Sequence, residues 1–272
     1  MTTRIALAVA YDGAAYHGWQ RQGSPVLPTV QADLEKALSR IAAAPIRVHC
    51  AGRTDSGVHA TAQIVHFDAP VDRGAKAWRM GSNSLLPKTV RVLWATPVEA
   101  SFHARFSALS RRYRYVILQQ SVAPAILSRQ LTHIRECLDV EAMDRAGRHL
   151  IGEHDFSAFR AAGCQSHSPW RNVMQLRVQR RGPFIVLDIR ANAFLQHMVR
   201  NIAGALLAVG RGERELDWIA RLLETRDRRQ GAVTASPNGL YLVDVEYPGE
   251  FGLPEMEAGP IFLAGMPVAE DH

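Results

Sequence analysis

Residues 52–59 have the sequence Gly-Arg-Thr-Asp-Ser-Gly-Val-His, which concentrates reactive side chains in one short segment. The cation Arg53 stands two positions before Asp55, and an opposite charge nearby favours the ionised form of a carboxylate. The two glycines allow the backbone to bend sharply or to approach a ligand closely. An ionised carboxylate on such a loop can act as a nucleophile or as a base. A β-turn with an Asx hydrogen bond and a surface ion pair is the alternative interpretation of these eight residues.

A second candidate is Tyr113, which lies in the sequence Arg-Arg-Tyr-Arg-Tyr at residues 111–115. On a strand, Arg111, Tyr113 and Tyr115 would share one face, and the other two arginines would lie on the opposite face. Arginines interleaved with aromatic rings suit both phosphate contact and base stacking. A sheet strand with one aromatic core face and one solvated arginine face explains the same pattern without any function.

The apolar periodicity of the first half predicts the elements that position the 52–59 loop. It predicts strands over residues 4–9, 46–50, 63–68 and 90–98, and helices over residues 30–41 and 75–86. Thr29 is the expected N-cap of the first helix. The order strand–helix–strand–strand–helix–strand is that of a ferredoxin-like unit.

The second half repeats this order of elements. Strands are predicted over residues 111–118, 173–180, 184–190 and 240–247, and helices over residues 140–151, 198–209 and 216–223, with Asp139 as an N-cap. The predicted fold class is α/β (α+β): two ferredoxin-like units forming one long mixed, mainly antiparallel sheet, with helices on one side and a central cleft. We expect an N-terminal half at 1–106, a C-terminal half at 107–248 and a tail at 249–272.

Composition narrows the classes of partner and site. The chain has 272 residues, 47% of them hydrophobic, and a net charge of +6 to which arginine contributes most of the cations. Arginine can form bidentate bonds with phosphates and stack on bases, so an anionic partner fits this charge. Three widely spaced cysteines give no metal-binding pattern, and no Rossmann fingerprint or P-loop is present, so we expect no metal and no cofactor. The sequence has no signal peptide and no apolar run of membrane-spanning length, so we expect a cytoplasmic protein.

Six ordered segments resemble the tRNA pseudouridine synthase A family. They are 11–22 (YDGAAYHGWQRQ), 52–67 (GRTDSGVHATAQIVHF), 102–115, 163–173, 191–210 and 239–248. They span nearly the whole chain and are together far more specific than any single motif. The resemblance implies isomerisation of uridine to pseudouridine at positions 38, 39 and 40 of the tRNA anticodon stem-loop. It also implies tRNA as the partner, a homodimer, and chemistry without a cofactor.

The resemblance assigns roles by matching positions. Asp55 matches the catalytic aspartate, and Arg53 matches an arginine that holds the target base out of the stack; a simple ion pair with Asp55 is the alternative for Arg53. Tyr113 matches a pocket tyrosine that stacks on uracil and removes the proton from carbon 5. Arg200 matches an arginine that pairs with the catalytic aspartate, against the alternative of a helix-surface charge.

Leu240 matches an apolar residue that lines the uracil pocket, for which plain core packing is the alternative. Weaker candidates for RNA contact are the basic residues Arg21, His103, Arg105, Arg226, Arg228 and Arg229. Charge runs are usually solvated faces, so none of these positions is assigned by its charge alone.

Two further functions fit the same sequence. One is a catalytically silent RNA-binding module, because ferredoxin-like sheets commonly bind RNA. The presence of Asp55, Tyr113 and Arg200 together favours the enzyme, since a silent module has no need of all three. The other is a pseudouridine synthase that acts on a different RNA, which the basic surface does not exclude.

Overall fold

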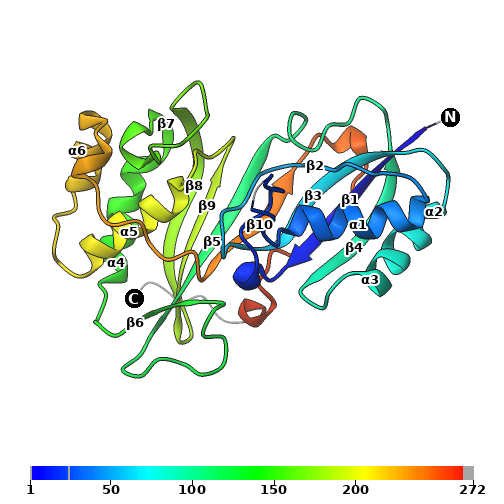
Figure 1. Ribbon diagram of the computed structural model, residues 1–272. Helices are drawn as coiled ribbons and strands as arrows, with labels where there is room; N and C mark the ends of the chain where they lie inside the picture. Colours follow the sequence, from blue (N-terminus) through cyan, green and yellow to red (C-terminus); the bar gives the residue numbers. More distant parts are fainter. Residues whose placement is uncertain (1, 24, 266–272) are drawn as a thin grey trace. The chain divides into compact units, whose positions relative to one another are not determined.

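The computed structural model describes residues 2–23 and 25–265, and the chain divides into two compact units (Figure 1). The first unit comprises residues up to Ser110 together with the segment Tyr241–Pro260. The second comprises Arg111–Leu240 and the segment that begins at Ile261. Helices and mostly antiparallel strands make up both units, which confirms the predicted fold class.

The first unit is built on a mostly antiparallel sheet. Its elements are β1 (Thr3–Tyr11), α1 (Val30–Ala42), β2 (His49–Cys50), β3 (His59–Ala69), α2 (Gly74–Lys76), α3 (Ser82–Leu85) and β4 (Val90–Val98). A π-helical turn, η2 (Ala77–Gly81), joins α2 to α3, so the predicted second helix is present but underwound at its centre. In the sheet, β1 lies between β4 and β3 and is antiparallel to both. One end of β3 pairs with β2, and the other end pairs in parallel with β10 (Leu240–Glu246).

One local prediction for this unit was wrong, and another was right only in part. The predicted strand over 46–50 is only two residues long, because the amides of Ile46 and Val48 donate to the side chains of Ser39 and Glu35 on α1 at 2.9 and 3.1 Å. Those amides are therefore used by the helix and not by the sheet. Thr29 does occupy the N-cap position of α1, but its hydroxyl makes no capping bond. It is instead a buried hydroxyl without a hydrogen-bond partner among the described residues.

The second unit has a mostly antiparallel sheet, in the order β5 (Ser110–Gln119), β9 (Phe184–Ala191), β8 (Trp170–Arg181) and β7 (Gly152–Asp155). The strand β6 (Thr132–Ile134) pairs in parallel with β5. Its helices are α4 (Val140–Gly147), α5 (Met198–Gly210) and α6 (Trp218–Thr225). Asp139 caps α4 as predicted, since its carboxylate accepts the amide of Ala142 at 2.8 Å. The sequence did not predict β6 and β7, because three or four residues are too few to show an alternating pattern.

The helix α5 forms the centre of the second unit's core. Twelve of its thirteen residues are buried, and Arg200 is the exception. A helix that is apolar on all sides must be surrounded by protein. At Gly204, a Cβ atom would overlap the carbonyl oxygen of Val233, and at Gly210 it would lie 2.6 Å from the sulfur of Met143. A side chain at Gly204 would collide with backbone, and one at Gly210 would force the Met143 side chain to move, so α5 is closely packed at both positions.

Candidate active site

The 52–59 loop is held by the connection between β1 and α1. The amide of Trp19 donates to the carbonyl of Thr54 at 3.0 Å, and the amide of Gly57 donates to the carbonyl of Tyr16 at 3.3 Å. The Ser56 hydroxyl donates to the same Tyr16 carbonyl at 3.2 Å. Two segments that the sequence singled out separately, 11–22 and 52–67, thus form one hydrogen-bonded structure.

Buried side chains of β1 and β3 fix the start of the loop. The hydroxyls of Tyr11 and Thr54 lie 2.8 Å apart. The carboxamide of Gln63, which is completely buried, donates to the carbonyl of Gly52 at 2.5 Å and accepts its amide at 3.4 Å. A buried carboxamide needs such partners, because an unpaired one costs free energy. Sequence reasoning assigned no role to Tyr11 or Gln63, although both lie in the quoted segments.

Two glycines allow the β1–α1 connection to approach the loop. Gly18 has φ of +92°, and a Cβ atom there would lie 2.8 Å from the carbonyl oxygen of Thr54 and 3.2 Å from the carbonyl carbon of Asp55. At Gly13, a Cβ atom would overlap the carbonyl oxygen of Val58. The backbone on both sides of Asp55 is therefore packed directly against another segment of backbone.

The carboxylate of Asp55 stands at the start of a tight turn. The amide of Val58 donates to the carbonyl of Asp55 at 3.1 Å, and Gly57 provides the positive φ of 80° within the turn. Asp55 is half-buried and Arg53 is exposed. The β-turn that was the alternative interpretation of residues 52–59 is therefore present. It fixes the backbone position of Asp55.

His59 follows this turn and closes it onto the β1–α1 connection. Its ring is buried, and its Nδ1 accepts the amide of Gly13 at 3.1 Å. The Oδ1 of Asp12 lies 3.0 Å from the same nitrogen. The ring stacks on Tyr241 with a centroid distance of 4.8 Å. His59 thus positions the loop, a role that its place in a loop motif did not reveal.

Tyr113 lies on β5 in the second unit and is 8% exposed. Its ring meets Phe194 edge to face at 5.1 Å. The arginines that alternate with it are structural, and the solvated arginine face expected from the alternation is wrong. Arg112 and Arg114 donate to the buried carboxylate of Asp188 on β9 at 2.7 and 2.9 Å.

The charge of Asp188 depends on these arginines. Its burial opposes ionisation, but the hydrogen bonds from Arg112 and Arg114 outweigh that effect and hold the pKa of the carboxyl below its ordinary value. Arg111 is buried as well, and its guanidinium donates to the carbonyl of Asn192 at 2.9 Å. None of these three arginines therefore presents a fully solvated guanidinium to a phosphate.

Arg200 is held in place by the residues that follow α6. Its Nε donates to the carbonyl of Ala235 at 2.8 Å, and its own carbonyl accepts the amide of Ala235 at 3.1 Å. Burial raises the pKa of Tyr115 to about 12, and the hydrogen bond to Thr132 and the charge of Arg200 act in the opposite direction. Arg200 is half-buried and hydrogen-bonded to backbone, and its pairing with Asp55 stays a prediction.

The remaining candidates differ in their surroundings. Leu240 is buried and begins β10, as its core-packing alternative requires. Arg21 is exposed. Arg228 donates to the side chains of Asn201 and Thr234 at 3.1 and 3.0 Å and thus braces α5, whereas the exposed Arg229 pairs with Asp227 at 2.8 Å.

The described residues also limit other kinds of site. Among them, no group of three or more His, Cys, Asp or Glu side chains is arranged to hold a metal ion. Within the same ranges, the helices are too short or too polar to cross a membrane.

Comparison with known proteins adds independent findings. The family model described as tRNA pseudouridine synthase matches residues 7–107 and 146–248, which include Asp55, Arg200 and Leu240. Tyr113 falls between the two matched segments. A tRNA pseudouridine synthase A of Aeromonas hydrophila is 56% identical over 260 residues, with 96% of each chain covered. Proteins with the same name from Vibrio cholerae and Shewanella amazonensis are 57% and 56% identical, covering 96% of this chain and 98% and 99% of theirs.

Proposed function

We propose that this chain, which belongs to the tRNA pseudouridine synthase family, modifies the anticodon stem-loop at positions 38, 39 and 40. Membership of the family makes the chain an isomerase that forms pseudouridine in tRNA. The observation that carries the proposed site is the anchored 52–59 loop, in which backbone bonds to Tyr16 and Trp19 fix the segment that holds Asp55. The relatives of this chain that carry the name tRNA pseudouridine synthase A align with it over nearly their whole length.

The proposed reaction rearranges bonds without importing a group. The bond between N1 of uracil and C1′ of ribose breaks, the base turns within the pocket, and a bond forms between C5 and C1′. The proton on C5 leaves, and N1 gains one, so atoms and electrons balance without an oxidant or reductant. We therefore propose that no cofactor takes part. Asp55 supplies the ionised carboxylate that glycosidic chemistry requires, by attack on the sugar or the base, or by assisting a glycal intermediate.

The other residues have supporting roles in this proposal. The exposed Arg53 holds the target base out of the stack, as an enzyme that works on a base must do. Tyr113 stacks on the uracil and removes the proton from carbon 5. Arg200 pairs with Asp55, and Leu240 lines the uracil pocket.

The same proposal covers the division of labour along the chain and its assembly. The N-terminal half, 1–106, carries the aspartate loop, and the C-terminal half, 107–248, completes the cleft. The tail begins at residue 249, and its last seven residues lie outside the described ranges. We propose that the chain acts as a homodimer in the cytoplasm.

Pseudouridine mapping tests this function. Bulk tRNA is mapped from cells that lack the gene and from cells in which the parent chain or Asp55→Asn is restored. We expect the modification at positions 38, 39 and 40 to return only with the parent chain. Return at other tRNA positions would replace the proposed target, and return with Asp55→Asn would remove Asp55 from its role.

A further inference from the structure

An exposed aromatic ring lies on a rigid turn of the first unit. Phe106 is 75% exposed, yet the backbone that carries it is fixed. The amides of Arg105 and Phe106 donate to Nδ1 of His103 at 3.1 and 3.3 Å. The amide of Ser107 donates to the carbonyl of His103 at 2.9 Å, and its hydroxyl accepts the amide of His103 at 2.9 Å. Single exposed apolar residues are common on protein surfaces. Phe106 differs in its fixed backbone, which leaves less conformational freedom to lose when a partner binds.

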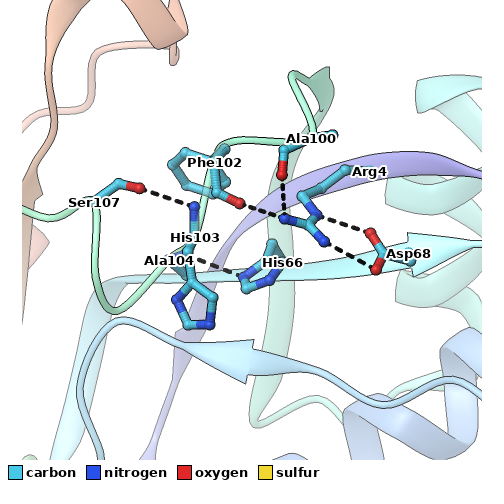
Figure 2. Close-up of polar contacts among 8 residues, drawn as sticks. All are labelled: Arg4, His66, Asp68, Ala100, Phe102, His103, Ala104 and Ser107. Atoms are coloured by element: carbon cyan, nitrogen blue, oxygen red, sulfur yellow. Dashed lines mark hydrogen bonds and ion pairs between the residues drawn. The ribbon is translucent and has the colours of Figure 1, made fainter.

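The sheet anchors the base of this turn (Figure 2). Arg4 on β1 forms a double ion pair with Asp68 at 2.8 and 3.0 Å and donates to the carbonyls of Ala100 and Phe102 at 2.5 and 3.0 Å. Nδ1 of His66 on β3 accepts the amide of Ala104 at 3.1 Å. The turn therefore cannot move without breaking bonds to two central strands.

The exposed ring ends a column of stacked rings. His49 stacks on His66 at 5.0 Å, His66 meets His103 edge to face at 4.5 Å, and His103 lies 4.4 Å from Phe106. Burial, with the charges of neighbouring His103 and Arg4, lowers the pKa of His66 to about 3. Burial also lowers the pKa of His103. At neutral pH these two rings are therefore neutral aromatic groups, and the column ends in an open ring.

A cation lies beside this open ring. The guanidinium carbon of Arg105 lies 5.5 Å from the centroid of Phe106. Burial raises the pKa of the Cys50 thiol to about 12, and the charges of Arg53 and Arg105 act in the opposite direction. The ring of His49 on β2 lies 5.4 Å from the ring of His103, and β2 ends at Cys50, two residues before Gly52, so the turn lies beside the start of the 52–59 loop. The nearby acid Asp68 is already committed to Arg4.

We infer that Phe106 and Arg105 form a stacking platform for an unpaired nucleobase of the tRNA, next to the base that the catalytic loop takes out. This inference rests on the proposed function. An aromatic face beside an arginine binds single-stranded nucleotides by stacking and by contact with the phosphate. When one base leaves the stack of the RNA loop, the face of the adjacent base is exposed. We infer that this adjacent base stacks on Phe106.

Binding measurements with variants test the platform. The probe is a fluorescein-labelled anticodon stem-loop RNA whose target uridines are replaced by cytidine, so that no reaction follows binding. Phe106→Ala should raise Kd roughly 5- to 150-fold, the range for one stacked base. Phe106→Trp should restore binding to within a few-fold. Phe106→Leu, which keeps an apolar side chain but has no ring face, should not.

A matched control separates stacking from general surface effects. Met80 is a large apolar residue of the same unit that is 53% exposed. Met80→Ala should leave Kd unchanged. The urea midpoint of Phe106→Ala should equal that of the parent, because so exposed a ring contributes little to the core. Equal Kd values for the parent and Phe106→Ala, or full binding by Phe106→Leu, would overturn the inference.

Abasic RNA identifies the partner of the ring. The effects of Phe106→Ala and of removing one base on the binding free energy should be non-additive when the stacked base is removed. They should be additive when a base at any other loop position is removed. Additivity at every position would refute a stacked base. A change of sedimentation coefficient in Phe106→Ala at unchanged Kd would identify the ring as a protein contact and equally overturn the inference. Failure of the proposed function is a separate result, seen when the parent chain forms no pseudouridine in unmodified tRNA.

Discussion

Replacement of Gly18 by alanine should reduce catalysis by moving the backbone of the aspartate loop. A side chain at φ of +92° costs about 1–2 kcal/mol, offset by about 0.4–1 kcal/mol gained from a less flexible unfolded chain. The new Cβ would also lie 2.8 Å from the carbonyl oxygen of Thr54, closer than real Cβ atoms come. That carbonyl already accepts the amide of Trp19 at 3.0 Å, so the loop has to shift.

The two effects have separate expected magnitudes. Overpacking costs about 1–3 kcal/mol in addition to the strain, so the free energy of unfolding should fall by about 1–5 kcal/mol in total. A misplacement of about 1 Å can cost roughly 100-fold in rate, so we expect kcat/KM to fall about 10- to 100-fold. Urea unfolding measures the first quantity, and steady-state formation of pseudouridine in tRNA measures the second.

Two other glycines of the first unit serve as controls. Gly74 has φ of +70° with no atom within 4 Å of its Cβ position, so Gly74→Ala introduces backbone strain alone. Gly23 has open space and no positive φ, so Gly23→Ala introduces neither effect. Full activity in Gly18→Ala, with a stability loss equal to that of Gly74→Ala, would refute the reasoning. The close contact between Gly18 and the Thr54 carbonyl would then not be what positions Asp55.

Asp55→Asn should abolish turnover while RNA binding stays within a few-fold of the parent in fluorescence titrations, because the shape is kept and the charge is lost; turnover above a few per cent would exclude the nucleophile role. Tyr113→Phe should slow turnover by about 10²–10⁴-fold in single-turnover assays because the phenol that accepts the proton is removed, and a parent-like rate would leave the ring as a stacking surface only. Asp188→Asn should lower the free energy of unfolding at pH 7 by about 3–5 kcal/mol, because Arg112 and Arg114 lose their buried anion. Since the folded-state pKa of Asp188 is depressed, its stabilisation is present above the unfolded-state value of about 3.9 and is lost as pH falls through the folded-state pKa, so urea unfolding should show the parent and variant converging below about pH 4. A difference between them that does not change with pH would contradict this assignment.

Local patterns were sufficient where an element is long and its pairing regular. The predicted strand over 90–98 matches β4 residue for residue, and the helix over 198–209 differs from α5 by one residue. The short strand β2 shows why a prediction failed. The helix that carries Glu35 was predicted, but the bond from the amide of Val48 to the Glu35 side chain was not. Long-range bonds decide such cases, and a single sequence does not display them.

The candidate site shows the same division. A motif marked Asp55 and its loop, because a carboxylate between an arginine and glycines is locally unusual. The residues that hold the loop were not found. Gln63 lies in a predicted strand and His59 ends the motif, and only the fold brings them to Gly52 and Gly13. The alternation at 111–115 correctly predicted two faces of a strand. It did not indicate that Arg112 and Arg114 would form ion pairs with Asp188 on the neighbouring strand.

The burial of α5 has a consequence for how the second unit opens. Amides of a helix enclosed on all sides exchange with solvent only when the surrounding core separates. We therefore expect the amides of α5 to be among the slowest of this unit to exchange with deuterium. Arg200 therefore lies on a helix that unfolds together with the core and not before it. Destabilising substitutions elsewhere in this unit should therefore lower the amount of folded protein. In the molecules that remain folded, the position of the Arg200 guanidinium should not change.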